Sequence, residues 1–168
     1  MTHEEKAVEN FLAGYNCAQS VFLAFAPDLG LSDDLALRLS SSFGGGMGRL
    51  REVCGAVSGI LMAAGALYGY TSPTDDDAKA AHYALVQDLA GQFRALHSTI
   101  LCRDLLGKTG PETPVPEART AAYYAQRPCA RFVGSAAAIL ERYMAQHPPL
   151  PRSEAGQPPL SPSAKGNR

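Results

Sequence analysis

The sequence predicts an all-α fold, a compact single-domain bundle of about six helices followed by a disordered tail. Apolar residues recur at three- and four-residue intervals, helix-capping residues precede several of these segments, and no alternating strand pattern stands out. The 168 residues, 46% of them hydrophobic, suffice for one domain with a real core. We therefore expect an all-helical four-cysteine domain over residues 1–146 and a Pro-rich disordered tail over residues 147–168.

The first three helices are predicted by apolar spacing and capping. Apolar residues recur at helical spacing through residues 3–15. Asn16 and Gln19 occupy capping-box positions at the start of a helix that should end before Pro27. Residues 32–34, Ser-Asp-Asp, resemble another helix start, because the helix dipole favours acidic residues in the first turn.

The middle of the chain combines a glycine-rich segment with a long uncharged one. Residues 43–48 predict a flexible loop that leads into a helix over residues 50–70. No charged residue occurs from 53 to 73, a length that would span a bilayer. The four glycines and the polar end of this run favour a buried central helix instead.

Three further segments complete the prediction. Residues 74–77 cap a helix with an expected buried stripe, and Gly107 ends a short helix that holds Cys102. Residues 107–116 predict a Gly/Pro loop, and Pro128 suits the first position of a last helix. The members of the expected stripe are Ala81, Leu85, Leu89, Phe93 and Leu96.

Charge and cysteine content narrow the function. The net charge is −1 without a basic stretch, so we expect no nucleic-acid partner. The N-terminus lacks the pattern of a signal peptide, which predicts a cytoplasmic protein. Stable disulfides are uncommon in that compartment, so four cysteines favour metal binding or redox chemistry. Four buried, inert thiols are the alternative.

The cysteines are far apart in sequence, at spacings of 37, 48 and 27 residues. The absence of a C-x-x-C pair disfavours a zinc knuckle and a thioredoxin-type motif. Each cysteine lies in the first turn or two of a predicted helix, where unpaired N–H groups and the dipole stabilise a thiolate. We therefore predict one site in which Cys17, Cys54, Cys102 and Cys129 act as redox-active residues or metal ligands.

Four glycines are candidates for cofactor contact: Gly45, Gly46, Gly55 and Gly59. Gly55 and Gly59 share one helix face, where each glycine costs about 1 kcal/mol relative to alanine. Close approach of another helix or of a cofactor would compensate for that cost. For these two glycines, helix packing alone is the other interpretation. Gly45 and Gly46 are expected to bring backbone close to Cys54.

The order Cys17, Cys54-Gly55-Ala56-x-x-Gly59, Cys102 and Cys129 resembles the C_GCAxxG_C_C family, which is named for redox activity. The segments around residues 16–19, 43–48 and 100–107 strengthen the resemblance, which covers about residues 5–145. A related module is similar to part of the split-Soret cytochromes, where an iron–sulfur centre is proposed. This chain has no C-x-x-C-H, so covalent haem is not expected.

Three functions are consistent with these residues. The first is iron–sulfur electron transfer or cluster handling, because four thiolates form the required ligand set. The second is thiol/disulfide exchange between paired cysteines. The third is a structural Cys₄ zinc site in an interaction protein. We expect a redox partner protein and no membrane insertion, and the sequence leaves open whether the chain forms a homodimer.

Overall fold

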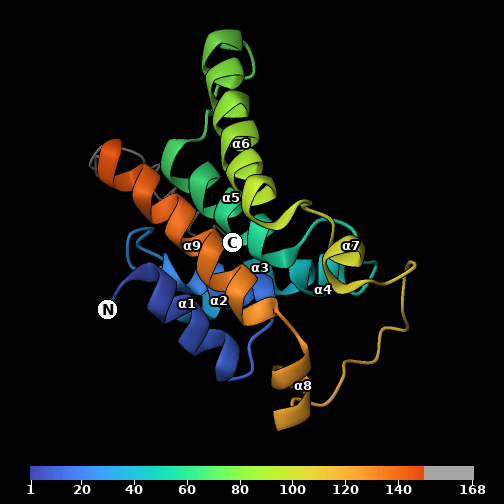
Figure 1. Ribbon diagram of the computed structural model, residues 1–168. Coiled ribbons are helices and arrows are strands. Elements are labelled where there is room, and N and C mark those ends of the chain that lie inside the picture. The colour runs from blue at the N-terminus through green and yellow to red at the C-terminus, as the bar shows by residue number, and fades with distance from the viewer. Residues whose placement is uncertain (150–168) are drawn as a thin grey trace, which may run out of the picture.

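The computed structural model describes residues 1–149, and helices account for most of them (Figure 1). The predicted all-α class is confirmed: the only β pairing within these residues is an isolated bridge between Val53 and Leu101. In chain order the elements are α1 (His3–Leu12), α2 (Cys17–Ala24), α3 (Asp33–Ser40), the 3₁₀ turn η1 (Ser41–Phe43), α4 (Gly44–Met47), α5 (Gly55–Tyr68), α6 (Asp76–His97), α7 (Cys102–Leu106), α8 (Ala121–Gln126) and α9 (Cys129–Gln146).

The core forms where α9 crosses α1, α2 and α5 (Figure 1). Small residues allow these helices to approach closely. A Cβ at Gly134 of α9 would lie 3.1 Å from the Val8 side chain of α1. A Cβ at Gly59 of α5 would lie 2.9 Å from the Val21 Cβ of α2. Gly59 therefore lies where α2 and α5 cross, which agrees with the interpretation that this glycine serves helix packing.

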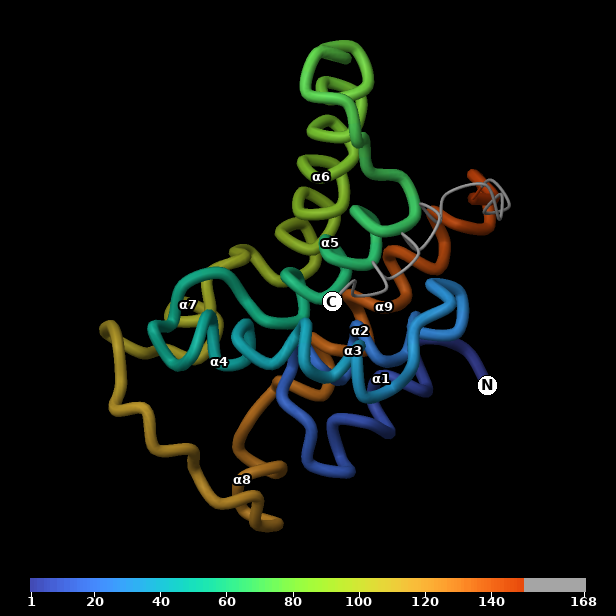
Figure 2. The backbone as a smooth tube through the Cα atoms, turned by 180° about the vertical axis from the view of Figure 1, so that it is seen from behind, coloured from blue at the N-terminus to red at the C-terminus, as the bar shows by residue number. Residues whose placement is uncertain are grey.

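Helix α6 extends well beyond the bundle in both views (Figures 1 and 2). Leu85, Leu89 and Phe93 of the predicted stripe are buried. The prediction is wrong for Ala81, which is exposed, and for Leu96, which is 62% exposed. Ala81 lies in the second turn of α6, and this N-terminal end of the helix projects from the bundle (Figure 1). Burial is therefore confined to the part of α6 that contacts α5 and α9.

The start of one helix and the presence of another differ from the prediction, and backbone hydrogen bonds explain both. Helix α5 begins at Gly55 rather than near residue 50, because Val53 pairs with Leu101 in an extended conformation. Helix α8 was not predicted: Thr120 caps it by accepting a hydrogen bond from the Tyr123 N–H at 3.2 Å. A tube view shows residues 107–120 running from α7 to α8 along the outside of the bundle (Figure 2).

The predicted tail falls mostly outside the described residues. Helix α9 ends at Gln146, and the Tyr68 hydroxyl donates to the carbonyl of His147 at 2.8 Å. Residues 150–168 are not described, so their disorder stays a prediction. Among the helices of residues 1–149, none has both the length and the apolar character needed to cross a membrane.

Candidate functional site

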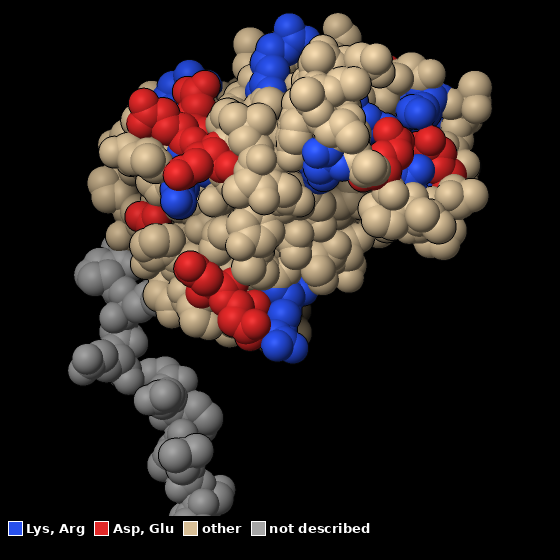
Figure 3. Space-filling view, turned by 90° about the horizontal axis from the view of Figure 1, so that it is seen from below, with Lys and Arg blue, Asp and Glu red and all other residues tan. Residues whose placement is uncertain are grey.

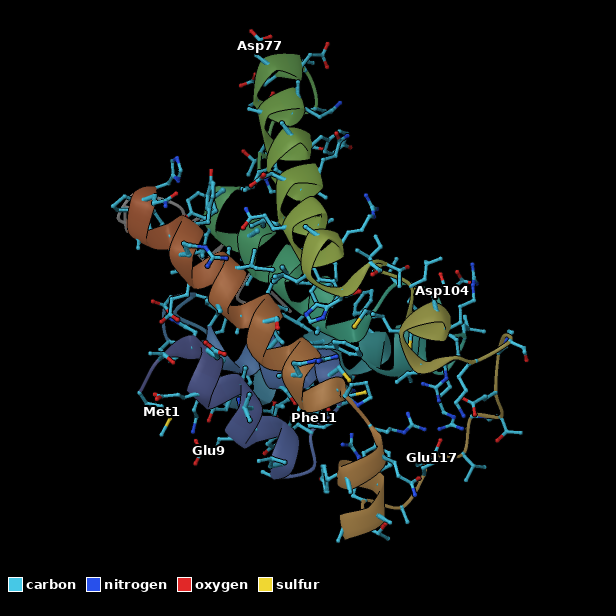
Figure 4. All side chains as sticks on the ribbon, in the orientation of Figure 1. Met1, Glu9, Phe11, Asp77, Asp104 and Glu117 are labelled. Carbon is cyan, nitrogen blue, oxygen red and sulfur yellow. The ribbon has the colours of Figure 1, made fainter. Side chains whose placement is uncertain are left out.

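All four cysteines border one cavity of about 370 Å³, although they come from four separate segments. Three of them begin helices: Cys17 starts α2, Cys102 starts α7 and Cys129 starts α9. Cys54 directly precedes α5. The predicted placement at helix starts is confirmed, and sulfur atoms gather near the N-terminal end of α9 (Figure 4). We call this space the cysteine cavity.

Cys17 and Cys129 form the first pair within the cysteine cavity. Asn16 holds the start of α2 through the predicted capping box: its side chain accepts from the Gln19 N–H at 2.9 Å, and Gln19 reciprocates at 3.2 Å. Helix α2 packs against α9, and the first residues of both helices line the same cavity. The Cys17 thiol then donates a hydrogen bond to the Cys129 sulfur.

This hydrogen bond shifts the pKa values of the two thiols in opposite directions. It lowers the pKa of Cys129 to about 7, against the opposing effect of burial, and the charges of Arg127 and Arg119 add to the lowering. The same hydrogen bond, together with burial, raises the pKa of Cys17 well above its ordinary value. Near neutral pH, Cys129 is therefore a thiolate in a large fraction of molecules, while Cys17 keeps its proton.

Cys54 and Cys102 form the second pair, which is held by extended backbone. The Cys54 N–H donates to the Ile100 carbonyl at 2.7 Å, and the Cys102 N–H donates to the Glu52 carbonyl at 2.6 Å. These bonds flank the bridge between Val53 and Leu101. Two segments that are about fifty residues apart are thereby fixed side by side, an arrangement that local sequence patterns did not predict.

Burial dominates the electrostatics of this second pair. It raises the pKa of Cys54 to about 12, although the N–H groups of Ala56 and Val57 act in the opposite direction. Burial also raises the pKa of Cys102, and the Arg51 guanidinium reduces that rise by donating to the Cys102 sulfur at 3.6 Å. Both thiols are protonated near neutral pH.

The glycine-rich segment forms a left-handed turn against Cys102. The five consecutive residues 45–49 have φ between 61° and 70°. For a residue other than glycine this conformation costs roughly 1–2 kcal/mol, which explains the glycines at three of the five positions. A Cβ at Gly46 would lie 2.7 Å from the Cys102 Cβ and 2.8 Å from the Glu52 nitrogen. The turn therefore lies directly against Cys102, and Gly45 and Gly46 line the same cavity as Cys54.

The four candidate glycines have different environments. Gly45, Gly46 and Gly55 line the cysteine cavity, whereas Gly59 lies at the crossing of α2 and α5. A Cβ at Gly55 would meet three groups: the Phe43 carbonyl oxygen at 2.9 Å, the Ala18 nitrogen at 3.1 Å and the Cys17 Cβ at 3.1 Å. The missing side chain at position 55 therefore lets the start of α5 reach the start of α2.

Four arginines that the sequence analysis did not select also line the cavity: Arg49, Arg51, Arg119 and Arg127. Arg51 is only 2% exposed and contacts the strap, which we define as residues 107–120. Pro114, Pro116, Glu117 and Arg119 of the strap line the cavity as well. The predicted Gly/Pro loop is thus one wall of the site.

Two glutamates hold the strap to these arginines. Glu112 accepts from Arg51, lies 3.6 Å from an Arg49 nitrogen and accepts from Lys108 at 3.1 Å. Glu117 contacts Arg127 and lies 3.6 Å from Arg49, and it faces the nitrogen-bearing side chains between strap and bundle (Figure 4). Burial acts to raise the pKa of both carboxyls, but their hydrogen bonds outweigh it and lower both values.

The sequence that forms this site matches one known protein family. A family model described as "Putative redox-active protein (C_GCAxxG_C_C)" matches residues 15–143. The chain belongs to this family. The matched range contains the four cysteines, the left-handed turn and the strap, so every part of the site lies within the C_GCAxxG_C_C region. Searches of curated proteins and of solved structures gave no match.

The arginines of this family member carried only weak sequence signals. Arg127 precedes Pro128 and Cys129, and this adjacency at a helix start could have indicated a thiolate partner. Arg103, which is adjacent to Cys102 in sequence, instead pairs with Glu52 at 3.1 Å. His82 and His97 are not among the residues that line the cavity.

Within residues 1–149, no three His, Cys, Asp or Glu side chains are arranged to hold a metal ion. The four cysteines are free thiols. The closed Cys₄ zinc site stays a prediction.

Proposed function

We propose that this protein is a thiol/disulfide oxidoreductase in which Cys129 is the nucleophile and Cys17 the resolving thiol. The observation that carries the proposal is that Cys17 and Cys129, the first residues of α2 and α9, line one cavity, where a hydrogen bond between them lowers the pKa of Cys129 and raises that of Cys17. It provides one thiolate and one protonated neighbour within contact distance. Disulfide exchange requires this combination, and the attacking thiol works best when its pKa is near ambient pH.

The reaction consists of two exchanges. The Cys129 thiolate attacks one sulfur of an oxidised substrate, and the substrate S–S bond breaks. One half of the substrate leaves as a thiolate, and the other half stays bound to Cys129 as a mixed disulfide. That thiolate takes the Cys17 proton, and the Cys17 thiolate then attacks the Cys129 sulfur. A Cys17–Cys129 disulfide forms as the second thiolate leaves. The substrate disulfide gains two electrons, and a dithiol reductant returns the protein to its starting state by the reverse exchanges.

The surroundings of Cys129 support this division of roles. Arg127 and Arg119 stabilise the Cys129 thiolate, and the N–H groups at the start of α9 add partial positive charge. The charge of Arg127 is held in place by Glu117, and its guanidinium lies 4.8 Å from the Tyr123 ring centroid. The charged groups that favour a thiolate are therefore positioned before a substrate arrives.

Disulfide mapping tests the proposal. Reduced protein is treated with one equivalent of a small disulfide, quenched by alkylation, digested and analysed by mass spectrometry. We expect a Cys17–Cys129 bond in the wild type and in Cys54→Ser. In Cys17→Ser, the reaction should stop at a mixed disulfide on Cys129. A first adduct on Cys54 or Cys102, or a bond between those two alone, would refute the proposed pair.

A second candidate is a Cys₄ iron–sulfur protein. It is favoured by the four cysteines that line one cavity at helix N-termini and by the Arg51 hydrogen bond to the Cys102 sulfur. Four thiolates match the usual ligand set of such clusters, which would supply one-electron transfer. Cys17, Cys54, Cys102 and Cys129 would hold the cluster. The Arg51 N–H would tune its potential, because hydrogen bonds to ligand sulfur do so.

Anaerobic reconstitution with iron and sulfide distinguishes the two candidates. A cluster predicts visible absorbance that is lost in Cys54→Ser as well as in Cys129→Ser. The dithiol site predicts that exchange persists in Cys54→Ser, because that thiol takes no part in the two steps. A colourless wild type with stoichiometric disulfide exchange would eliminate the cluster candidate.

A further inference from the structure

The cysteine cavity has more positive than negative side-chain charge. Four arginines line it, and two glutamates, Glu112 and Glu117, pair with three of them. Arg119 is the fourth, and no carboxylate pairs with it among residues 1–149. The chain as a whole has a net charge of −1, so this excess is local. On the face shown in Figure 3, by contrast, acidic and basic side chains lie in mixed clusters.

Arg119 has an unused hydrogen-bond donor. Its guanidinium lies 4.7 Å from the ring centroids of Phe11 and Tyr123, and its Nη2 donates to the Tyr15 carbonyl at 3.2 Å. Its Nη1 is buried and has no hydrogen-bond partner within the described residues. A buried donor left without an acceptor destabilises the folded protein. An anionic ligand in the cavity that Arg119 lines would supply the missing acceptor.

The size of the cavity and the burial of the thiols favour a small molecule. Cys54, Cys102 and Cys129 are only 5–6% exposed, so a disulfide on the surface of a folded protein has little access to them. The cavity volume of about 370 Å³ falls within the range of small-molecule sites, roughly 300–1,000 Å³. Cys129, Arg119 and Arg127 all line this cavity, so a small substrate inside it would lie near the nucleophile and both guanidinium groups.

We infer that the oxidised substrate is a small-molecule disulfide with anionic groups, such as carboxylates, close to its S–S bond. The inference rests on the proposed exchange at Cys129 and adds the chemical class of the substrate. Its carboxylates accept hydrogen bonds from Arg119 and neutralise the excess charge, and this binding keeps the disulfide beside the nucleophile. In this exchange, two substrate thiols form as Cys17 and Cys129 become a disulfide.

Three dialkyl disulfides of similar size test this substrate class: 3,3′-dithiodipropionate is anionic, bis(2-hydroxyethyl) disulfide is neutral and cystamine is cationic. The second-order rate constant of each with reduced protein is divided by its rate constant with dithiothreitol, which corrects for leaving-group differences. We expect the normalised rate constant of the anionic disulfide to exceed that of the neutral one by about tenfold at low salt. The cationic disulfide should be the slowest, and about 0.5 M salt should reduce the differences.

The variant Arg119→Gln should reduce the anionic-to-neutral ratio toward one. Because Arg119 also supports the Cys129 thiolate, all three rate constants should fall, and the ratio is therefore the decisive readout. Arg142→Gln, an exposed position on α9, is the matched control and should keep the wild-type ratio.

The outcomes separate this inference from the proposed function. Equal normalised rates for anionic and neutral disulfides at Cys129 would overturn the substrate class and leave the exchange intact. No reaction of any disulfide at Cys129 would refute the exchange itself. A preference for the anionic disulfide that survives in Arg119→Gln would overturn the assignment of the binding group to Arg119.

Discussion

The two cysteine pairs share one cavity but differ in electrostatics. Cys17 and Cys129 meet through the ends of two packed helices, and one of them has a lowered pKa. Cys54 and Cys102 are held by extended backbone pairing, and the pKa values of both are raised. All four lie at helix starts. A helix N-terminus alone therefore does not make a thiolate at neutral pH.

What distinguishes the pairs is the balance between burial and nearby donors. At Cys54, two backbone N–H groups face the sulfur, yet burial still raises the pKa to about 12. At Cys102, Arg51 contributes a hydrogen bond, but Glu112 shares the Arg51 charge. At Cys129, a thiol donor acts together with Arg127 and Arg119, and their sum exceeds the effect of burial.

The largest expected effect is on thiol reactivity. Cys129→Ser should remove the rapidly alkylated thiol near pH 7 and lower the initial rate with iodoacetamide by more than about tenfold, because only the thiolate reacts. Cys54→Ser is the matched variant from the other pair and should keep the rapid phase. If Cys54→Ser removed that phase, the assignment of the two pairs would have to be exchanged.

The second-largest expected effect is on the free energy of unfolding. It tests the close approach of α5 and α2, which brings the two cysteine pairs together. Gly55→Ala should destabilise the protein by about 1–3 kcal/mol, because the new Cβ would meet the backbone of Phe43 and Ala18. Gly65→Ala, in the same helix with open space around the position, should be neutral or stabilising by up to about 1 kcal/mol. Urea unfolding measures both changes. Similar changes in the two variants would argue against the close approach of α5 and α2.

A smaller effect is expected from Arg127→Gln. Loss of this charge should raise the pKa of Cys129, so the alkylation rate should reach its midpoint at higher pH. Stopped-flow alkylation from pH 5 to 9 measures the midpoint, and Arg142→Gln serves as the exposed control. An unchanged midpoint would mean that Cys17 and the helix end suffice to stabilise the thiolate.

The smallest effect lies at the opposite end of α9 and separates stability from thiol chemistry. His3 bridges Asp28 at 2.8 Å and Glu141 at 2.9 Å. Burial acts to lower its pKa, but these carboxylates outweigh burial and raise it. The stabilisation is fully present below the unfolded value, about 6.5, and is lost as pH rises through the folded pKa.

Thermal unfolding between pH 5.5 and 8 should therefore show a larger loss of stability in wild type than in His3→Gln. The difference should be below about 1 kcal/mol, and His147→Gln is a surface control. Cys129 alkylation should be the same in all three proteins. A pH dependence that is unchanged in His3→Gln would exclude the bridge as its source.

Local signals in the sequence account for the helices and for the helix-start position of each cysteine. Asn16 with Gln19, and Pro128 before Cys129, are short-range patterns, and capping depends on neighbouring residues only. The pairing of Val53 with Leu101 and the ion pairs of Glu112 with Arg49 and Arg51 depend on segments about fifty or more residues apart. Those contacts arise only after folding, so local sequence patterns could not predict the four arginines that line the cavity or the division of the cysteines into two pairs.

Residue-resolved alkylation of the wild type tests the central claim most directly. Reduced protein is pulsed with isotope-coded iodoacetamide across a pH series, and the four cysteine peptides are quantified separately. We predict that the rate for Cys129 rises with pH and reaches its midpoint near pH 7, while Cys17, Cys54 and Cys102 react only at much higher pH. Equal labelling of all four peptides, or earlier labelling of Cys54 or Cys102, would contradict the account.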